Sequence, residues 1–258
     1  MSVPEVAARG FGDAARAYER ARPTYPADLL PWLAHTLSIG ARSWICDLGA
    51  GTGKLTRALA GLSSRLVAVE PLTGMRAVLA DEVPGVMLVG ATAEALALRN
   101  GSLDAVMVAQ AFHWFDCAAS LDEIARALRP GGGVALVWNA WDDTVDWVER
   151  IHRVVAGAGS TPQWQRGHRS RAWAADALGA HPRFGAPAQA QLPHAQTLTL
   201  EGVVDRAATT SHIAAADPVR REAVLAEVRD ILATHPETRD RDVVEFPYVT
   251  EVHASVRS

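Results

Sequence analysis

The segment Ile45-Cys-Asp-Leu-Gly-Ala-Gly-Thr-Gly-Lys-Leu-Thr56 decides the fold of this chain. It begins with apolar residues typical of a short buried strand, turns at three glycines spaced G-x-G-x-G, and continues with leucines at helical spacing. Glycines at the end of a strand let the backbone approach a ligand closely, and the following helix N-terminus offers free N–H groups. The segment therefore predicts a strand, a ligand-binding turn and a helix.

The glycine spacing separates this turn from two phosphate-binding motifs. The dinucleotide pattern G-x-G-x-x-G requires a glycine where Lys54 stands, which disfavours a nicotinamide-dependent oxidoreductase. The P-loop requires glycine at Leu48 and a hydroxyl residue at Leu55, so Gly53-Lys54 is only a partial match. What remains is Asp47 ahead of G-x-G-x-G, a combination suited to a ligand with an amino group and no phosphate.

Apolar segments and helical patterns alternate around this unit. Strands are expected at 43–49, 65–70, 86–90, 103–109 and 133–138. The helix after the fourth strand is expected to begin with a capping box formed by Ser120 and Glu123. Strands that are apolar almost throughout indicate a parallel sheet covered on both faces, and right-handed crossovers make it doubly wound. Ligands bind such sheets at the carboxyl ends of the strands.

The pattern changes after Trp141. Helices are expected at 145–155, 200–208 and 220–232, a sixth strand at 187–192, and a closing strand at 246–256. We therefore predict an α/β fold with a Rossmann-like, doubly wound, mostly parallel seven-stranded sheet and a helical cap from the C-terminal half. One domain over 1–258 would comprise N-terminal helices (1–40), the Rossmann-like core (41–141), the helical cap with the sixth strand (142–245) and the closing strand (246–258).

The composition predicts a soluble cytoplasmic protein. The chain has 258 residues, 49% of them hydrophobic and 21% charged, which is enough for a substantial core. Cys46 and Cys117 are too few for a disulfide framework, and no apolar run suits a signal peptide or a bilayer span. A net charge of −4 attracts neither nucleic acid nor an anionic membrane, so neither is expected as a partner. The histidines show no metal-ligand spacing, and no metal is expected.

Glu70 ends the second expected strand, where nucleoside-binding Rossmann folds carry an acid that binds ribose hydroxyls. Together with the glycine turn it predicts a nucleoside-binding site. The segments Ile45–Thr56, Val67–Pro71 and Leu128–Gly132 resemble, in this order, the motifs of class I S-adenosylmethionine-dependent methyltransferases. The resemblance implies S-adenosylmethionine as the methyl donor and S-adenosylhomocysteine as the product.

Two further stretches narrow the resemblance. Tyr18-Glu-Arg-Ala-Arg-Pro-Thr-Tyr-Pro26 and Gln110-Ala-Phe-His-Trp-Phe115 are similar to the type 11 methyltransferase branch that includes trans-aconitate and cantharidin methyltransferases. The N-terminal helices would then cover the cofactor. Tyr18 and Arg22 would close over it, and Arg22 would pair with its carboxylate.

The resemblance also implies contacts along the rest of the cofactor. The glycine turn would line its methionine portion, Asp47 would bind the amino group directly or through water, and Glu70 would bind the ribose. The remaining expected cofactor contacts are Gly49, Ala50, Gly51 and Gly53 in the turn, Leu72 and Met75 near the adenine, Thr92, Ala93 and Glu94 at the adenine edge, and Gln110 beside the methyl group.

Methyl transfer from a sulfonium depends mainly on alignment, and a base is needed only if the acceptor carries a proton. His113, Trp114 and Gln110 are the candidate catalytic residues, because they follow the fourth strand. His113 could act as a base, as a hydrogen-bond donor, or only in the structure. Six of the eight tryptophans lie between residues 114 and 173, which weakly favours an apolar or aromatic acceptor.

Several functions remain open at this stage. We expect a methyltransferase of a small molecule, with a carboxylate oxygen as the candidate acceptor atom, acting as a monomer or homodimer. Arginines 166, 169 and 171 of the cap could bind an acidic substrate, although a solvated surface is the simpler explanation. A basic strip of arginines 9, 16, 20 and 22 is the one feature that favours a macromolecular substrate. A protein that binds S-adenosylmethionine without catalysis would carry the same motifs.

Overall fold

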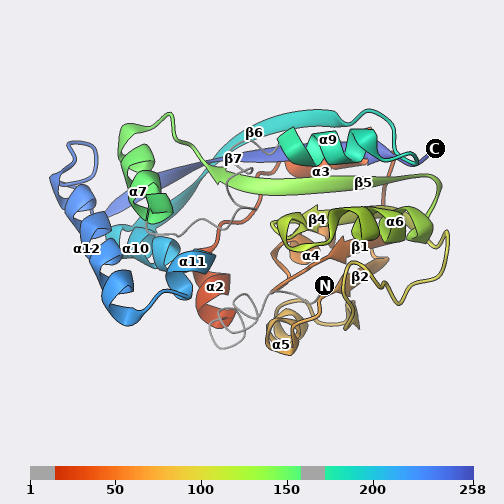
Figure 1. Cartoon of the computed structure of the whole chain (residues 1–258), viewed down its shortest axis with the longest axis horizontal. Coiled ribbons are helices and arrows are strands. Elements are labelled where there is room, and N and C mark those ends of the chain that lie inside the picture. The colour runs from red at the N-terminus through yellow and green to blue at the C-terminus, as the bar shows by residue number, and fades with distance from the viewer. Residues whose placement is uncertain (1–14, 158–171) are drawn as a thin grey trace.

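The computed structural model describes residues 15–157 and 172–258. Within them, seven strands form one sheet in the order β3-β2-β1-β4-β5-β7-β6 (Figure 1). The first five strands pair in parallel, and β7 runs antiparallel between β5 and β6. The predicted doubly wound, mostly parallel sheet is therefore confirmed. Its strands are β1 (Ile45–Leu48), β2 (Leu66–Val69), β3 (Met87–Val89), β4 (Leu103–Ala109), β5 (Leu128–Trp141), β6 (Ala188–Thr199) and β7 (Val243–Val256).

The parallel strands are apolar almost throughout because helices cover both faces of the sheet. Successive side chains of a strand point to opposite faces, so Ile45 and Cys46 of β1 enter different layers. One layer packs against α6 (Cys117–Ala127) and α9 (Ala172–Ala180), and the other against α3 (Leu29–Thr36) and α4 (Lys54–Leu59). Helix α5 (Thr73–Glu82) follows β2.

The predicted capping box at Ser120 is wrong. The N-cap of α6 lies four residues before Ser120, where the side chain of Asp116 accepts a hydrogen bond from the backbone N–H of Ala119. Ser120 lies inside the helix, and Glu123 pairs with Arg126 at 2.6 Å. Asp116 satisfies a free N–H of the first turn as well as a serine does, so the helix can begin ahead of Ser120.

The sixth strand and the closing strand are both longer than predicted. β6 continues to Thr199 past Pro193, and β7 begins at Val243. Proline is tolerated there because β6 is the edge strand, so one side of its backbone makes no ladder hydrogen bonds. The extra length carries β6 and β7 out of the core, where Val244, Phe246 and Tyr248 enter a second hydrophobic cluster.

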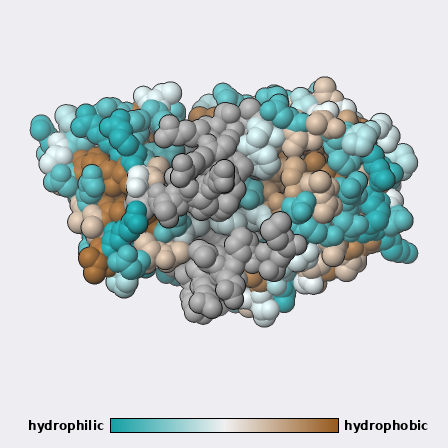
Figure 2. Space-filling view, viewed as in Figure 1, coloured by the Kyte–Doolittle hydropathy of each residue, from teal (hydrophilic) through white to brown (hydrophobic). Residues whose placement is uncertain are grey.

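The helical cap has its own hydrophobic core. Its helices are α7 (Asp146–Gly157), α10 (Leu200–Ala208), α11 (Ser211–Ala214) and α12 (Pro218–Thr234), and they gather at the left of Figure 1, around the far ends of β6 and β7. Figure 2 shows a mainly hydrophilic surface over much of this view, with hydrophobic residues gathered among the cap helices. In the described ranges, no helix is both long and apolar enough to cross a membrane.

Candidate functional site

The turn after β1 needs its glycines. Gly49, Gly51 and Gly53 all have positive φ, at 70°, 58° and 90°, a conformation that other residues adopt only with strain. A Cβ on Gly49 would lie 2.6 Å from the Cβ of Ala111, whereas a Cβ on Gly51 would meet nothing within 4 Å. The first glycine is therefore required for packing, and the second keeps the cavity beside it open.

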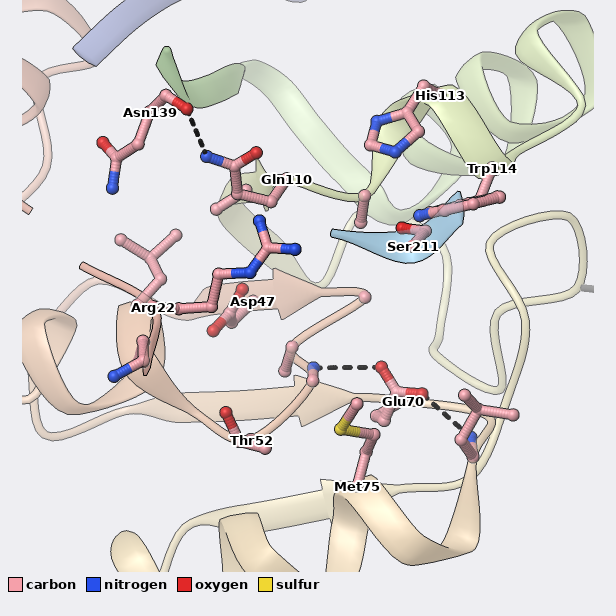
Figure 3. A pocket seen from close by; sticks show the side chains of 18 of the residues that line it. Arg22, Asp47, Thr52, Glu70, Met75, Gln110, His113, Trp114, Asn139 and Ser211 are labelled. Carbon is pink, nitrogen blue, oxygen red and sulfur yellow. Dashed lines mark hydrogen bonds between the residues drawn. The ribbon is translucent and has the colours of Figure 1, made fainter. Parts of the chain in front are cut away.

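Glu70 connects this turn to the end of β2. Its carboxylate accepts hydrogen bonds from the backbone N–H of Gly51, at 3.0 Å, and from that of Leu72, at 2.9 Å, one on each oxygen (Figure 3). Burial raises the pKa of Glu70, and the two backbone donors oppose this shift. Each carboxylate oxygen keeps a further lone pair, so Glu70 can still accept from two hydroxyl groups of a ligand.

Asp47 is the second carboxylate of the cavity. It is 2% exposed and accepts a hydrogen bond from the hydroxyl of Thr56 at 2.5 Å. No cation among the described residues forms an ion pair with it, and burial raises its pKa to about 7, with a smaller contribution from Glu70. A buried carboxylate of this kind is stabilised by a positively charged ligand group.

Helix α2 (Ala15–Ala21) is held against the turn by Glu19, which the sequence analysis missed. Its carboxylate accepts from the hydroxyl of Thr52 at 2.5 Å and pairs with Lys54 at 3.1 Å and Arg57 at 2.7 Å. Lys54, which stands at the lysine position of the partial P-loop match, therefore forms an ion pair with the N-terminal helix. Tyr18 lies in α2, but its side chain is outside the described residues.

The candidate catalytic residues follow β4, as predicted. Gln110 has a positive φ of 56°, which is unusual outside glycine, and its side-chain amide donates to the backbone carbonyl of Asn139 at 3.2 Å. His113 and Trp114 lie in the short helix η1 (Phe112–Trp114), with ring centroids 4.8 Å apart. Figure 3 shows Gln110 and His113 on the side of the cavity opposite Glu70 and Met75.

One cavity brings most of the predicted residues together. It contains about 1150 Å³ of empty space, its open mouth included. The predicted residues that line it are Arg22, Asp47, Gly49, Ala50, Gly51, Glu70, Leu72, Met75, Gln110, His113 and Trp114. Gly53 does not line the cavity. A Cβ at this position would lie 2.8 Å from Leu79 Cγ, so a glycine is needed there for packing against α5.

The three residues expected at the adenine edge lie beside a smaller cleft. Thr92, Ala93 and Glu94 line it together with Gly49 and Trp114, which also line the main cavity. Glu94 accepts a hydrogen bond from the backbone N–H of Asp116 at 2.9 Å, so one of its oxygens already anchors the start of α6. Contact of these residues with adenine stays a prediction.

The cap side of the cavity contains residues that the sequence analysis did not single out. Asn139 follows the fifth expected strand, and its side chain donates to the carbonyl of Thr24 and accepts from Thr250. A polar residue at the end of a buried strand was a usable signal. Arg206 and Ser211 come from α10 and α11, and no motif marked them.

Arg22 lines the cavity, and its guanidinium donates to the carbonyl of Thr209 at 2.6 Å. It therefore does not belong to the predicted basic strip on the surface. Of that strip, Arg20 is exposed, while residue 9 and the side chain of residue 16 are outside the described residues. Arginines 166, 169 and 171 are also outside them. No group of three or more metal-ligating side chains occurs among the residues that the structure describes.

The sheet order, the glycine turn and Glu70 define a Rossmann-like protein whose cavity has the residues suited to a nucleoside-containing ligand. Residues 46–136 match a family described as Methyltransferase domain. The chain is 37% identical over 240 residues to the uncharacterized methyltransferase Rv3342 of Mycobacterium tuberculosis, covering 93% of this chain and 92% of that one. It is 33% identical over 243 residues to the uncharacterized methyltransferase-like C25B8.10 of Schizosaccharomyces pombe, covering 92% and 91%.

A solved structure from Anaeromyxobacter dehalogenans, described as a type II methyltransferase, superposes with a TM-score of 0.65. It is 25% identical, and the match covers 92% of this chain and 96% of that one. The chain belongs to the class I S-adenosylmethionine-dependent methyltransferases.

Proposed function

We propose that this methyltransferase transfers the methyl group of S-adenosylmethionine to a small molecule held between the sheet and the helical cap, with a carboxylate oxygen as the acceptor atom. The observation that carries the proposal is the pair of buried carboxylates, Asp47 and Glu70, on either side of the glycine turn in one cavity. They fit a ligand with an ammonium group and a ribose, and they would repel phosphate.

The other residues of the cavity fit the rest of the cofactor. Gly51 leaves open space beside the turn, where the methionine portion would lie. Leu72 and Met75 offer an apolar wall for adenine, and the Arg22 guanidinium can pair with the carboxylate of the cofactor. The stretches that contain Arg22 and Gln110 support a position in the branch of trans-aconitate and cantharidin methyltransferases.

The bound sulfonium supplies an activated methyl carbon with a good leaving group. An acceptor carboxylate oxygen forms the new C–O bond as the C–S bond breaks, and the electron pair stays on sulfur. The products are a neutral methyl ester and a neutral thioether, and no proton is transferred. Gln110, His113 and Trp114 would align the acceptor and exclude water, and such alignment can be worth up to about 7–11 kcal/mol.

The surroundings of His113 support an acceptor that needs no base. Trp138 donates its indole N–H to Nδ1 of His113 over a long 3.5 Å contact. In the neutral ring that accepts at Nδ1, the proton is on Nε2. The Nδ1 lone pair is then engaged by Trp138 and is not free to act as a base, which suits a carboxylate better than an amine or hydroxyl that must lose a proton.

The test is methyl transfer from radiolabelled S-adenosylmethionine to a panel of small acids, phenols and amines, with protein and RNA as separate acceptors. We expect labelled ester from at least one acid, and loss of that product in the Glu70→Ala variant. Label on protein or RNA, with none on any small acid, would contradict the proposal and favour a macromolecular substrate.

We also propose a cytoplasmic location, which the two free cysteines support. Cell fractionation would test this location.

A further inference from the structure

Arg206 is a buried cation in the wall of the cavity. Its side chain comes from α10 of the cap, only 4% of the residue is exposed, and it lines the same cavity as the glycine turn. Arginine is almost never buried to this extent unless it is paired. The surroundings of the guanidinium therefore decide whether Arg206 serves the fold or a ligand.

No anion of the described chain neutralises Arg206. Its Nε donates to the hydroxyl of Tyr248 at 3.1 Å, and its Cζ lies 5.2 Å from the ring centroid of Trp141 and 5.9 Å from that of Tyr248. These aromatic contacts hold the plane of the guanidinium in place. Nη1 is buried and has no hydrogen-bond partner among the described residues, and no carboxylate there forms an ion pair with Arg206.

A buried guanidinium with an unsatisfied N–H edge is unfavourable in the unliganded protein. The planar fork of arginine matches a carboxylate, which accepts two parallel hydrogen bonds. Resting on the proposed function, we infer that Arg206 binds a carboxylate of the methyl acceptor, so that the acceptor is a small organic acid.

The position of Arg206 assigns it to the acceptor rather than to the cofactor. The proposed cofactor groups lie on the loops after β1 and β2 and on the segment after α2. Helix α2 is tied to the glycine turn through Glu19, and Arg22 follows that helix directly. Arg206 belongs instead to the cap, whose core includes its neighbours Val203 and Val204.

The charges of the cavity favour a carboxylate over a phosphate. Asp47 and Glu70 line it together with Arg22, Lys54 and Arg206, and Lys54 is already paired with Glu19. The cofactor would occupy both carboxylates and Arg22, which leaves one guanidinium for the acceptor. A single positive charge balances a carboxylate but not a phosphate dianion.

The test compares binding of acids and their amides to wild type, Arg206→Met, Arg206→Lys and Arg22→Met, with Arg221→Met, an exposed residue of α12, as the matched control. The acids are benzoate, phenylacetate and fumarate, with phenyl phosphate as the phosphate probe. Affinities come from thermal-shift titrations with and without S-adenosylhomocysteine, and calorimetry gives the affinity for S-adenosylhomocysteine itself.

We expect at least one acid, and none of the amides, to raise the melting temperature of the wild type and of Arg221→Met. Arg206→Met should lose about tenfold or more in affinity for that acid, as expected for hydrogen bonds to a charged group. Arg206→Lys should regain part of it. Without ligand, Arg206→Met should melt at the same temperature as wild type or higher, because an unpaired buried charge has been removed.

Five results would overturn the inference. The first four are equal binding of acids and amides, unchanged acid binding by Arg206→Met, tighter binding of phenyl phosphate than of every acid, and no acid binding by the wild type. A loss of S-adenosylhomocysteine affinity in Arg206→Met as large as that in Arg22→Met would also overturn it, because Arg206 would then serve the cofactor. If the wild type does not bind S-adenosylhomocysteine at all, the proposed function fails. The acid titrations made in the absence of S-adenosylhomocysteine still test the role of Arg206 in that case.

Discussion

At the scale of single residues, the ionisation of Asp47 connects folding with ligand binding. Burial raises its pKa to about 7, whereas an unfolded chain has an aspartate pKa of about 3.9. Between these values the folded state binds more protons than the unfolded state, so this group contributes stability at low pH that is lost as pH rises through about 7. A ligand ammonium group would offset this loss of stability, because it favours the ionised form of Asp47.

The first prediction follows from this linkage. Affinity for S-adenosylhomocysteine should rise between about pH 6 and 7.5, by up to roughly tenfold per pH unit on the acid side, while the ligand amino group stays protonated. Calorimetry in two buffers of different ionisation enthalpy should show proton release on binding. Asp47→Asn should bind more weakly and lose the pH dependence. An unchanged pH dependence in that variant would contradict the role of Asp47.

The second prediction separates the two glycines of the turn. Gly49→Ala should destabilise the fold by about 1–3 kcal/mol through overpacking against Ala111, in addition to the strain of positive φ. Gly51→Ala meets no protein atom and should cost only about 1–2 kcal/mol of backbone strain, yet abolish binding of S-adenosylhomocysteine. Urea denaturation and calorimetry measure the two effects. Normal binding by Gly51→Ala would show that the cofactor does not lie against this turn.

At this scale, the sequence predicted the residues that belong to a local pattern. Asp47, the glycines and Glu70 were identified because strand ends of a parallel sheet meet at one edge. Arg206 was not, because it lies 95 or more residues from most of the cavity lining in the chain and sits in an ordinary helix. Only the tertiary packing of the cap brings it to the site.

At the scale of elements, one carboxylate fixes helix α2 against the glycine turn. Glu19 pairs with Lys54 and Arg57 and accepts from Thr52, so the N-terminal helix and the glycine turn are joined by one side chain that is 11% exposed. Arg22 follows α2 directly and lines the cavity.

The third prediction concerns this connection. Glu19→Ala should weaken binding of S-adenosylhomocysteine by about threefold to thirtyfold, as expected for the loss of one or two partly buried charged hydrogen bonds. Its melting temperature should change little, because α2 contributes few residues to the main clusters. Glu227→Ala, an exposed change on α12, is the control. Wild-type affinity in Glu19→Ala would mean that α2 does not contribute to the cofactor site.

The order and type of the elements were predictable because apolar strands and helical spacing repeat regularly through the core. Their ends were less predictable. The sixth strand was predicted to end at residue 192, but it continues through Pro193, because an edge strand accepts proline. The start of α6 was predicted from a capping box at Ser120, but Asp116 caps the helix instead.

At the scale of the whole molecule, the cavity lies where the core and the cap meet. The long strands β5, β6 and β7 run through both parts (Figure 1). The core side supplies the proposed cofactor contacts, and α10 and α11 supply Arg206 and Ser211. The cofactor and the acceptor would therefore be bound by different parts of the chain.

The fourth prediction tests this division by hydrogen exchange. S-adenosylhomocysteine should slow amide exchange in the glycine turn, in residues 70–72 and in α2. A bound acid should add protection in α10 and α11. Helix α12 contributes no residue to the cavity lining and serves as the internal reference. Protection of α12 equal to that of α2 would indicate general stabilisation instead of two adjoining sites.

The most direct test of the central claim is calorimetric titration of wild type and Glu70→Ala with S-adenosylmethionine, S-adenosylhomocysteine and NAD, with Glu227→Ala as the control. We predict binding of the first two in the micromolar range, about −8 kcal/mol, and none of NAD. Loss of the hydrogen bonds to Glu70 should weaken binding by about tenfold to a hundredfold. Preferential binding of NAD, or equal affinity in wild type and Glu70→Ala, would contradict the account.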